Sequence, residues 1–201
     1  TPVVIDPETT FITLTTTFKF DSSLTTKDVS TLQTDVLNAV IEYSSDSLED
    51  FTGMFRYSEV LKTIDDADTS ILSNITKVKM YKFITPTLNS ALKYTISYNN
   101  AFYNPHSEHN KTAGGVVSST GFKISNDDST NEHFLDDDGA GNLRVYYLSG
   151  TTRIYTSSDF GTVDYTNGEI VLTSANITSI SNVDGAASTK IRVTVQPDSN
   201  D

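Results

Sequence analysis

Apolar and polar residues alternate along several stretches of the chain, a period of two that is typical of β-strands with one face buried. In residues 11–20 one face is mostly aliphatic and aromatic, and the other is mostly threonine. Residues 71–84 and 92–98 alternate in the same way. We therefore predict strands over these three stretches, and a hairpin loop at 85–90 that joins the last two.

The stretch from Thr25 to Asn74 differs, because its apolar residues are spaced as in a helix. Its first part places them three and four apart, which predicts a long helix over residues 26–44. The stripe consists of Val29, Leu32, Val36, Leu37, Val40 and Ile41. Thr25 followed by Asp28 resembles a capping box that would start this helix.

A second, shorter helix is predicted later in the same stretch, with Ser58 as its cap. Three carboxylates follow it, at Asp65, Asp66 and Asp68. Acids at a helix C-terminus oppose the helix macrodipole. The helix should therefore end by Asp65, and the acids should lie in a loop rather than form a catalytic cluster.

The periodic pattern fades between residues 99 and 115, which marks a predicted domain boundary. Residues 1–100 are predicted to be an α+β domain of order strand-helix-helix-strand-strand, in which a small antiparallel or mixed sheet has two helices on one face. Residues 101–201 are predicted to be an antiparallel all-β domain of hairpins. Its clearest turns are DDDGAGN and Thr166-Asn167-Gly168, and Asn-Gly between β-formers is a strong hairpin signal.

Composition narrows the possible functions. The 201 residues carry a formal net charge of −12 and no cysteine, which excludes disulfides and thiolate chemistry. An acidic surface repels phosphate backbones, so we expect no nucleic-acid partner. No apolar run approaches the ~20 residues that span a bilayer, so we expect no membrane partner. The chain begins without Met, and we expect a fragment of a longer protein or a processed one.

One acidic region is a candidate cation site. It contains Asp127, Asp128, Glu132, Asp136, Asp137 and Asp138. Ca²⁺ prefers several oxygen ligands from one loop, but this spacing does not match an EF-hand. We interpret the region as a solvated hairpin tip, with weak cation binding over 127–138 as the alternative.

The three histidines suggest another metal site, formed by His106, Glu108, His109 and His133, but their spacing lacks the HExxH pattern of a zinc helix. We interpret residues 106–109 as an exposed loop. The sequence has no Gly-x-Ser-x-Gly nucleophile motif and no phosphate-binding loop. We therefore predict no catalytic, cofactor-binding or metal site, no cofactor, and no enzymatic activity.

Several segments together resemble the baseplate wedge subunit family of contractile-tailed, T-even-type bacteriophages, in the C-terminal part of its large wedge protein. The similar elements are Ile41-Glu42-Tyr43, Leu48, Phe51-Thr52-Gly53, Phe55, Ser58, Ile64-Asp65, Asp68 and Ser70-Ile71. The opening VVIDPETTFITL resembles the strand before the family's helix. NLRVYYL at 142–148 and GTVDYTNGEIVL at 161–172 resemble its C-terminal hairpins.

The resemblance implies structural work in the virion. In that family the subunit helps form the wedge ring, contacts itself and other wedge proteins, and rearranges when the tail contracts. It is assembled in the host cytoplasm. We would expect interfaces on the helix at 26–44 and the loop at 46–56. The alternative is a receptor- or glycan-binding tail domain, for which Tyr146, Tyr147, Tyr155 and Tyr165 would supply a binding face. A tail glycosidase acting through two carboxylates is a third hypothesis.

Overall fold

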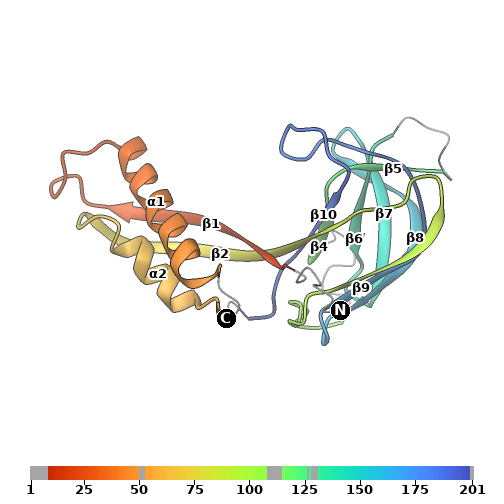
Figure 1. The fold of residues 1–201 in the computed structure, drawn as a ribbon, viewed down its shortest axis with the longest axis horizontal. Coiled ribbons are helices and arrows are strands. Elements are labelled where there is room, and N and C mark those ends of the chain that lie inside the picture. The colour runs from red at the N-terminus through yellow and green to blue at the C-terminus, as the bar shows by residue number, and fades with distance from the viewer. Residues whose placement is uncertain (1–8, 50–52, 108–114, 126, 128–130, 200–201) are drawn as a thin grey trace, which may run out of the picture. The chain divides into compact units, whose positions relative to one another are not determined.

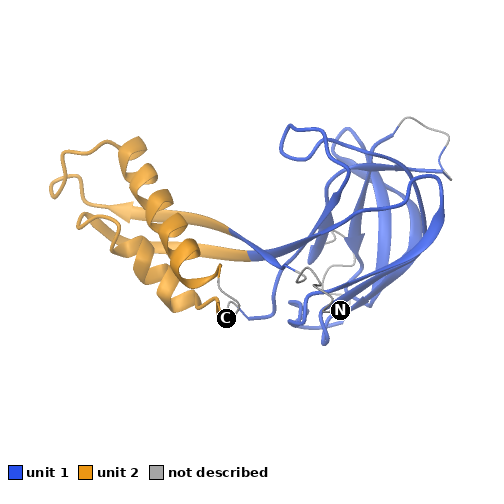
Figure 2. Cartoon of the chain, in the orientation of Figure 1, with its two compact units in different colours: residues 1–13, 79–199 blue, residues 14–78, 200–201 orange. Residues whose placement is uncertain are grey.

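The computed structural model describes residues 9–49, 53–107, 115–125, 127 and 131–199 (Figure 1). These residues fold into two compact units (Figure 2), which we call the helical unit, residues 14–78, and the barrel unit, residues 9–13 with 79–199. Their elements are β1 (Phe11–Phe20), α1 (Val29–Ser47), α2 (Tyr57–Asp65), β2 (Ile71–Ile84), β3 (Ala91–Ser97), β4 (Val117–Ser119), β5 (Phe122–Ile124), β6 (His133–Asp137), β7 (Asn142–Ser149), β8 (Thr152–Asp164), β9 (Glu169–Ile180) and β10 (Ile191–Val195).

The helical unit packs both helices against one face of β1 and β2 (Figure 1). Its core joins Val36 of α1, Val60 and Ile64 of α2 and Ile71 of β2, with Leu14 and Phe18 of β1 partly buried against them. Leu14 and Phe18 lie on the face of β1 that the sequence predicts to be buried, and the alternating exposure of this strand confirms its period of two. The predicted arrangement of two helices on one face of a sheet is confirmed.

The helix starts differ from the prediction at both caps. Asp28 itself is the N-cap of α1, because its side chain accepts a hydrogen bond from the Thr31 N–H; the predicted capping box begun by Thr25 is wrong. The N-cap of α2 is Arg56, which makes no side-chain cap bond, so Ser58 lies inside the first turn. The predicted end at Asp65 is confirmed.

The predicted hairpin across residues 85–90 is wrong. β2 belongs to a four-stranded sheet of order β1-β2-β10-β4, whereas β3 pairs with β9 in a second sheet. β10 takes the place beside β2 in antiparallel register, from Ile191 opposite Ile84 to Val195 opposite Met80. Val193 and Val195 are fully buried there. This burial of apolar surface favours pairing of β2 with β10 over pairing with β3, the next strand in the chain.

The second sheet closes on itself. Its order is β3-β9-β5-β6-β7-β8, and β8 also pairs with β9, so the five strands β5 to β9 form a closed barrel with β3 added outside. Closure removes free edges, which is how small barrels avoid edge-to-edge association. The large buried residues of its interior include Leu135, Leu143, Val145, Ile170, Leu172 and Ile177. The predicted hairpins β6–β7 and β8–β9 are confirmed.

These findings support an α+β description with mostly antiparallel strands, while the predicted domains 1–100 and 101–201 stay a prediction. Two strand pairings cross residue 100, β2 with β10 and β3 with β9. Within the described part of the chain, no helix combines the length and apolar character needed to cross a membrane.

The barrel closes at Gly161. This residue of β8 lies opposite Leu143 of β7 and also opposite Leu172 of β9, so both neighbours approach it. A Cβ atom there would lie 1.9 Å from the Val171 carbonyl oxygen, and a backbone atom cannot move aside as the end of a side chain can. Glycine in a strand interior often marks such a close approach of another backbone.

Gly161→Ala should therefore destabilise the barrel unit. We expect the free energy of unfolding to fall by about 2–3 kcal/mol, as in other overpacked cores. Urea unfolding followed by circular dichroism measures it, with the exposed neighbour Thr162→Ala as the matched control. If the two variants are equally stable, β8 and β9 can move apart to accept a methyl group without loss of unfolding free energy, and the close approach at Gly161 is not required.

Candidate functional site

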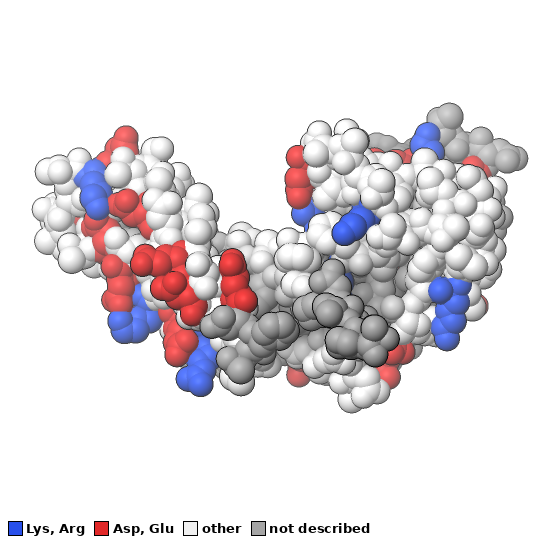
Figure 3. All heavy atoms as spheres, viewed as in Figure 1, with Lys and Arg blue, Asp and Glu red and all other residues white. Residues whose placement is uncertain are grey.

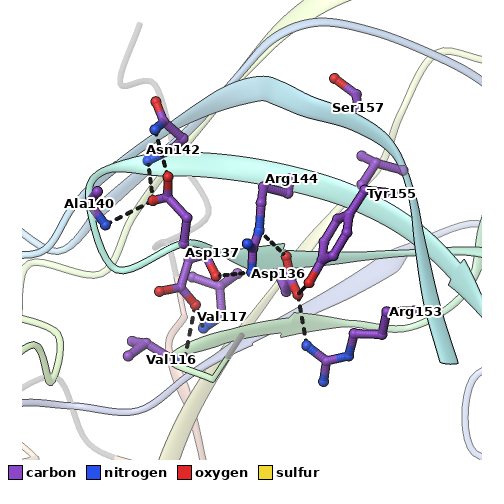
Figure 4. Close-up of polar contacts among 12 residues, drawn as sticks. Val116, Val117, Asp136, Asp137, Ala140, Asn142, Arg144, Arg153, Tyr155 and Ser157 are labelled. Atoms are coloured by element: carbon purple, nitrogen blue, oxygen red, sulfur yellow. Dashed lines mark hydrogen bonds and ion pairs between the residues drawn. The ribbon is translucent and has the colours of Figure 1, made fainter. Parts of the chain in front are cut away.

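The acidic region of β6 and its turn is the first candidate, and most of its carboxylates are internal (Figure 4). Asp136 is 2% exposed and is held by two arginines: its Oδ1 lies 2.8 Å from Arg144 Nε and its Oδ2 lies 2.7 Å from Arg153 Nη1. The Tyr155 hydroxyl donates to the same Oδ2 at 2.8 Å. Buried charge is tolerated when it is paired and hydrogen-bonded in this way.

Asp137 is completely buried, and its carboxylate binds the backbone of a strand rather than an arginine side chain. Its Oδ1 accepts hydrogen bonds from the backbone N–H groups of Val116 and Val117, at 3.0 and 2.9 Å. Its Oδ2 accepts one from the Tyr165 hydroxyl at 2.8 Å. Burial, together with the Asp137 carboxylate beside it, raises the pKa of Tyr165, so this hydroxyl stays a donor. Asp137 therefore fixes the start of β4 to β6.

Of the three consecutive acids at 136–138, Asp138 alone fits the predicted solvated tip, and Glu132 of the same region is exposed as well. The Asp138 carboxylate accepts hydrogen bonds from the Ala140 and Asn142 N–H groups and from the Asn142 side chain. Burial alone would raise the pKa of Asp138, but these bonds outweigh it and lower the pKa. The interpretation as a solvated tip is wrong for Asp136 and Asp137, because β6 continues through both of them.

The predicted histidine cluster is not brought together among the described residues. His106 is exposed, His133 is 1% exposed, and Glu108, His109 and Asp128 lie outside the described residues. His133 Nε2 lies 2.9 Å from Asp127 Oδ2. Searching the described residues finds no group of three or more His, Asp or Glu placed to hold a metal ion. That the whole chain holds no catalytic, cofactor or metal site stays a prediction.

An open cleft of about 600 Å³ lies in the barrel unit. It is lined by Ala101, Phe102, Asn104, Ser107, Gly139, Ala140, Gly141, Val163, Asp164, Tyr165, Thr166 and Asp198. Its described lining includes no His, Lys or Arg. The Tyr165 hydroxyl is already used by Asp137. The described lining of this cleft therefore supplies hydroxyl and carboxylate groups but no basic side chain.

A ridge on α1 is the second candidate. Leu37 and Ile41 are each 57% exposed, and residues four apart lie on one side of a helix, so they form an apolar ridge that we call the α1 ridge. Every charged residue of α1 is a carboxylate: Asp35, Glu42 and Asp46. Figure 3 shows carboxylates over the helical unit on the face in view. α1 is an acidic helix, but at 3.6 residues per turn its acids lie on the other side from the ridge, and Glu42 and Asp46 line a cleft beside α2.

A strip of aromatic and arginine side chains on the barrel is the third candidate, which we call the aromatic ladder. Strand register places its members on one face: Phe134 of β6, Tyr146 and Leu148 of β7, and Arg153 and Tyr155 of β8. The rings of Phe134 and Tyr146, and of Tyr146 and Tyr155, have centroids 5.8 Å apart.

Two arginines hold the ladder in place. The Arg153 guanidinium lies 4.7 Å from the Tyr146 ring centroid, and Arg144 lies 4.4 Å from that of Tyr155. Cation–π contacts of this kind are favourable when partly desolvated. Leu148, opposite Arg153, remains 49% exposed at the end of the strip.

Comparison with known families gives a match in the N-terminal part. Residues 8–83 match the family model described as Baseplate structural protein gp6, C-terminal domain III. This segment is similar to the gp6 baseplate family. The match covers β1, both helices and β2 almost to its end, so it contains the whole helical unit. A search of curated proteins finds no match to the chain.

The gp6 match confirms the resemblance to baseplate wedge proteins over residues 8–83. It supports a structural role in the phage baseplate, a location in the virion tail, and contacts with other baseplate proteins. The family description also favours a non-enzymatic role. The barrel lies beyond the match, so the likeness of residues 142–148 and 161–172 to the family's hairpins stays a prediction.

Sequence reasoning missed the partners of the acids. The turn DDDGAGN sets a register that places Asp136 opposite Arg144, so this ion pair could have been found from the hairpin alone. It also missed Lys27, whose Nζ lies 2.8 Å from Asp35 Oδ2 and 2.7 Å from Asp68 Oδ2. No local pattern predicts that contact, because Lys27 and Asp68 are 41 residues apart.

Lys27 links the start of helix α1 to the loop before β2 through its ion pairs with Asp35 and Asp68. Its hydrogen bond, and that of the Ser70 N–H, lower the pKa of Asp68 to about 2. The folded pKa lies below the ~3.9 of an unfolded chain. The contribution of this carboxylate to stability is therefore fully present above that value and is lost as the pH falls through about 2.

Lys27→Met should raise the pKa of Asp68 from about 2 toward the ~3.9 of an unpaired carboxyl. Titration of the Asp68 carboxyl carbon by NMR measures it. Lys62→Met, which removes the partner of Asp66, is the matched control and should leave Asp68 unchanged. An unshifted Asp68 in Lys27→Met would show that the Ser70 N–H alone sets its pKa.

Asp137→Ala should destabilise the barrel strongly. The substitution leaves two buried backbone N–H groups and the Tyr165 hydroxyl without their acceptor, and we expect a loss of about 3 kcal/mol. Asp138→Ala, which removes a carboxylate at the exposed turn, should cost about 1 kcal/mol or less. Urea unfolding compares the two. If they cost the same, the buried carboxylate does not secure β4.

Proposed function

We propose that the chain is a structural subunit of a phage tail baseplate. It helps form the wedge ring by associating with copies of itself and with other wedge proteins, and it rearranges when the tail contracts. It is incorporated into virions in the host cytoplasm. The observation that carries this proposal is the gp6 family match, whose residues 8–83 contain the complete helical unit.

The surface of the helical unit supports an assembly role. Leu37 and Ile41 expose more than half of their side-chain surface, although both belong to the apolar stripe that predicts the helix. α1 buries only Leu32 and Val36 below a tenth of their surface. A helix that keeps part of its apolar stripe in water has surface left for a partner. The proposed rearrangement rests on the family alone.

The full chain, affinity-tagged and co-expressed with the other tail proteins of its phage, tests the proposal. We expect it to retain baseplate proteins on the column and to sediment as more than a monomer. The retained proteins are identified by mass spectrometry, with the tag alone as control. A chain that retains none of them and sediments as a monomer at every concentration would contradict a baseplate role.

A receptor- or glycan-binding tail domain is the second candidate function, and the aromatic ladder is the observation that favours it. Tyr155 is 36% exposed and Tyr146 is half-buried beside it, and aromatic rings can stack on sugars. Binding of the chain to a glycan array, abolished by Tyr155→Ser, would support this function. An array without any bound glycan would count against it.

A further inference from the structure

One sheet of this protein ends in a long edge strand. The barrel sheet joins β8 to β9, so in the described part of the chain the strands β5 to β9 have no free edge. The other sheet has the order β1-β2-β10-β4, and among the described residues β1 pairs with a strand on one side only. The outer side of an edge strand presents a row of backbone N–H and C=O groups with which another chain can pair.

β1 lacks the features with which proteins usually protect an edge. It is ten residues long, it contains no proline and no acid, and its single charged residue, Lys19, is second from its end. The other edges differ. β4 has three residues, β3 carries Lys93 at a register shift, and β2 carries Lys77 and Lys79 before its pairing with β10 begins. Short strands, lysines and bulges all discourage pairing with another chain, so β1 is the edge best suited to it.

The side of β1 that faces the helices is only partly covered. Leu14 and Phe18 pack against the core of the helical unit, yet both remain partly exposed. Thr16 lies on the same side of the strand, and its hydroxyl oxygen is 3.0 Å from that of Thr76 on β2. A strand added outside β1 would cover more of Leu14 and Phe18, and this burial of apolar surface favours association.

The sequence of β1 suits pairing with a second copy of itself. When residues 14–20 of two copies pair antiparallel over their whole length, Thr17 of one copy lies opposite Thr17 of the other, at a two-fold axis. This register keeps the side chains that face the helices on one side of the joined sheet. It places each Lys19 opposite a Thr15, so the two lysines lie on opposite sides of the axis and no like charges meet directly.

We propose that β1 of one copy of this chain pairs antiparallel with β1 of a second copy across a two-fold axis. The inference rests on the proposed self-association and names the strand that carries it. The pairing joins the β1–β2 sheets of two helical units into one continuous sheet. Because a two-fold contact uses the same surface on both copies, association through β1 stops at two copies.

A disulfide between two copies tests the pairing directly, because the native chain contains no cysteine. Thr17→Cys places one thiol of each copy at the proposed axis, where directly opposite Cβ atoms lie ~4.5–5.5 Å apart, near the separation that a disulfide needs. We expect oxidised glutathione to convert most of this variant into a covalent dimer on a non-reducing gel. Ser73→Cys is the matched control: Ser73 is exposed on the neighbouring strand β2, away from the axis, and should give little covalent dimer.

Thr17→Lys tests the same contact without a covalent bond. It brings two ammonium groups together at the axis, and like charges directly opposite each other oppose strand pairing. Thr17 is exposed, so the variant should fold, which circular dichroism verifies. Sedimentation of the full chain should show dimerisation weakened by at least about tenfold. Ser73→Lys adds the same charge on β2 and should dimerise like the native chain.

The outcomes separate this inference from the proposed function. If the native chain associates but Thr17→Cys forms no more covalent dimer than Ser73→Cys, other surfaces join the copies and the β1 pairing is wrong. If the native chain stays monomeric at every concentration yet retains other baseplate proteins, the pairing is wrong and the baseplate role stands. If Thr17→Lys loses a retained baseplate protein while its self-association is unchanged, β1 binds that protein instead, and the pairing is again wrong.

Discussion

Two adjacent carboxylates are buried in the barrel wall, and each needs partners that pair with its charge or donate hydrogen bonds to it. Asp136 and Asp137 follow one another on β6, and their side chains lie on opposite faces of the strand. On one face two arginines and a tyrosine hold Asp136, and their stacking on neighbouring rings builds the aromatic ladder. On the other face Asp137 holds the backbone of β4. Because β4 pairs with β10, and β10 with β2, this carboxylate secures the link between the two sheets in the barrel unit.

Local patterns in the sequence predict elements well and their partners poorly. The period of two along residues 11–20 and 71–84 matches β1 and β2 residue for residue. No local pattern predicts that β2 pairs with β10 instead of β3, because this pairing depends on apolar burial between strands that lie far apart in the chain. The acids show the same limit. Their number suggests a solvated loop, and only the register of the β6–β7 hairpin reveals that Asp136 faces Arg144.

The gp6 match and the exposed surfaces together support a structural role in the phage baseplate. The matched residues contain a small helical unit, and its helix α1 buries only Leu32 and Val36 in the core of that unit. The barrel, which lies beyond the match, supplies a preorganised strip of tyrosine and arginine.

Cryo-electron microscopy of the intact baseplate that contains this chain tests the central claim most directly. The account predicts density for residues 8–83 within the baseplate. A baseplate without this chain would contradict the structural role.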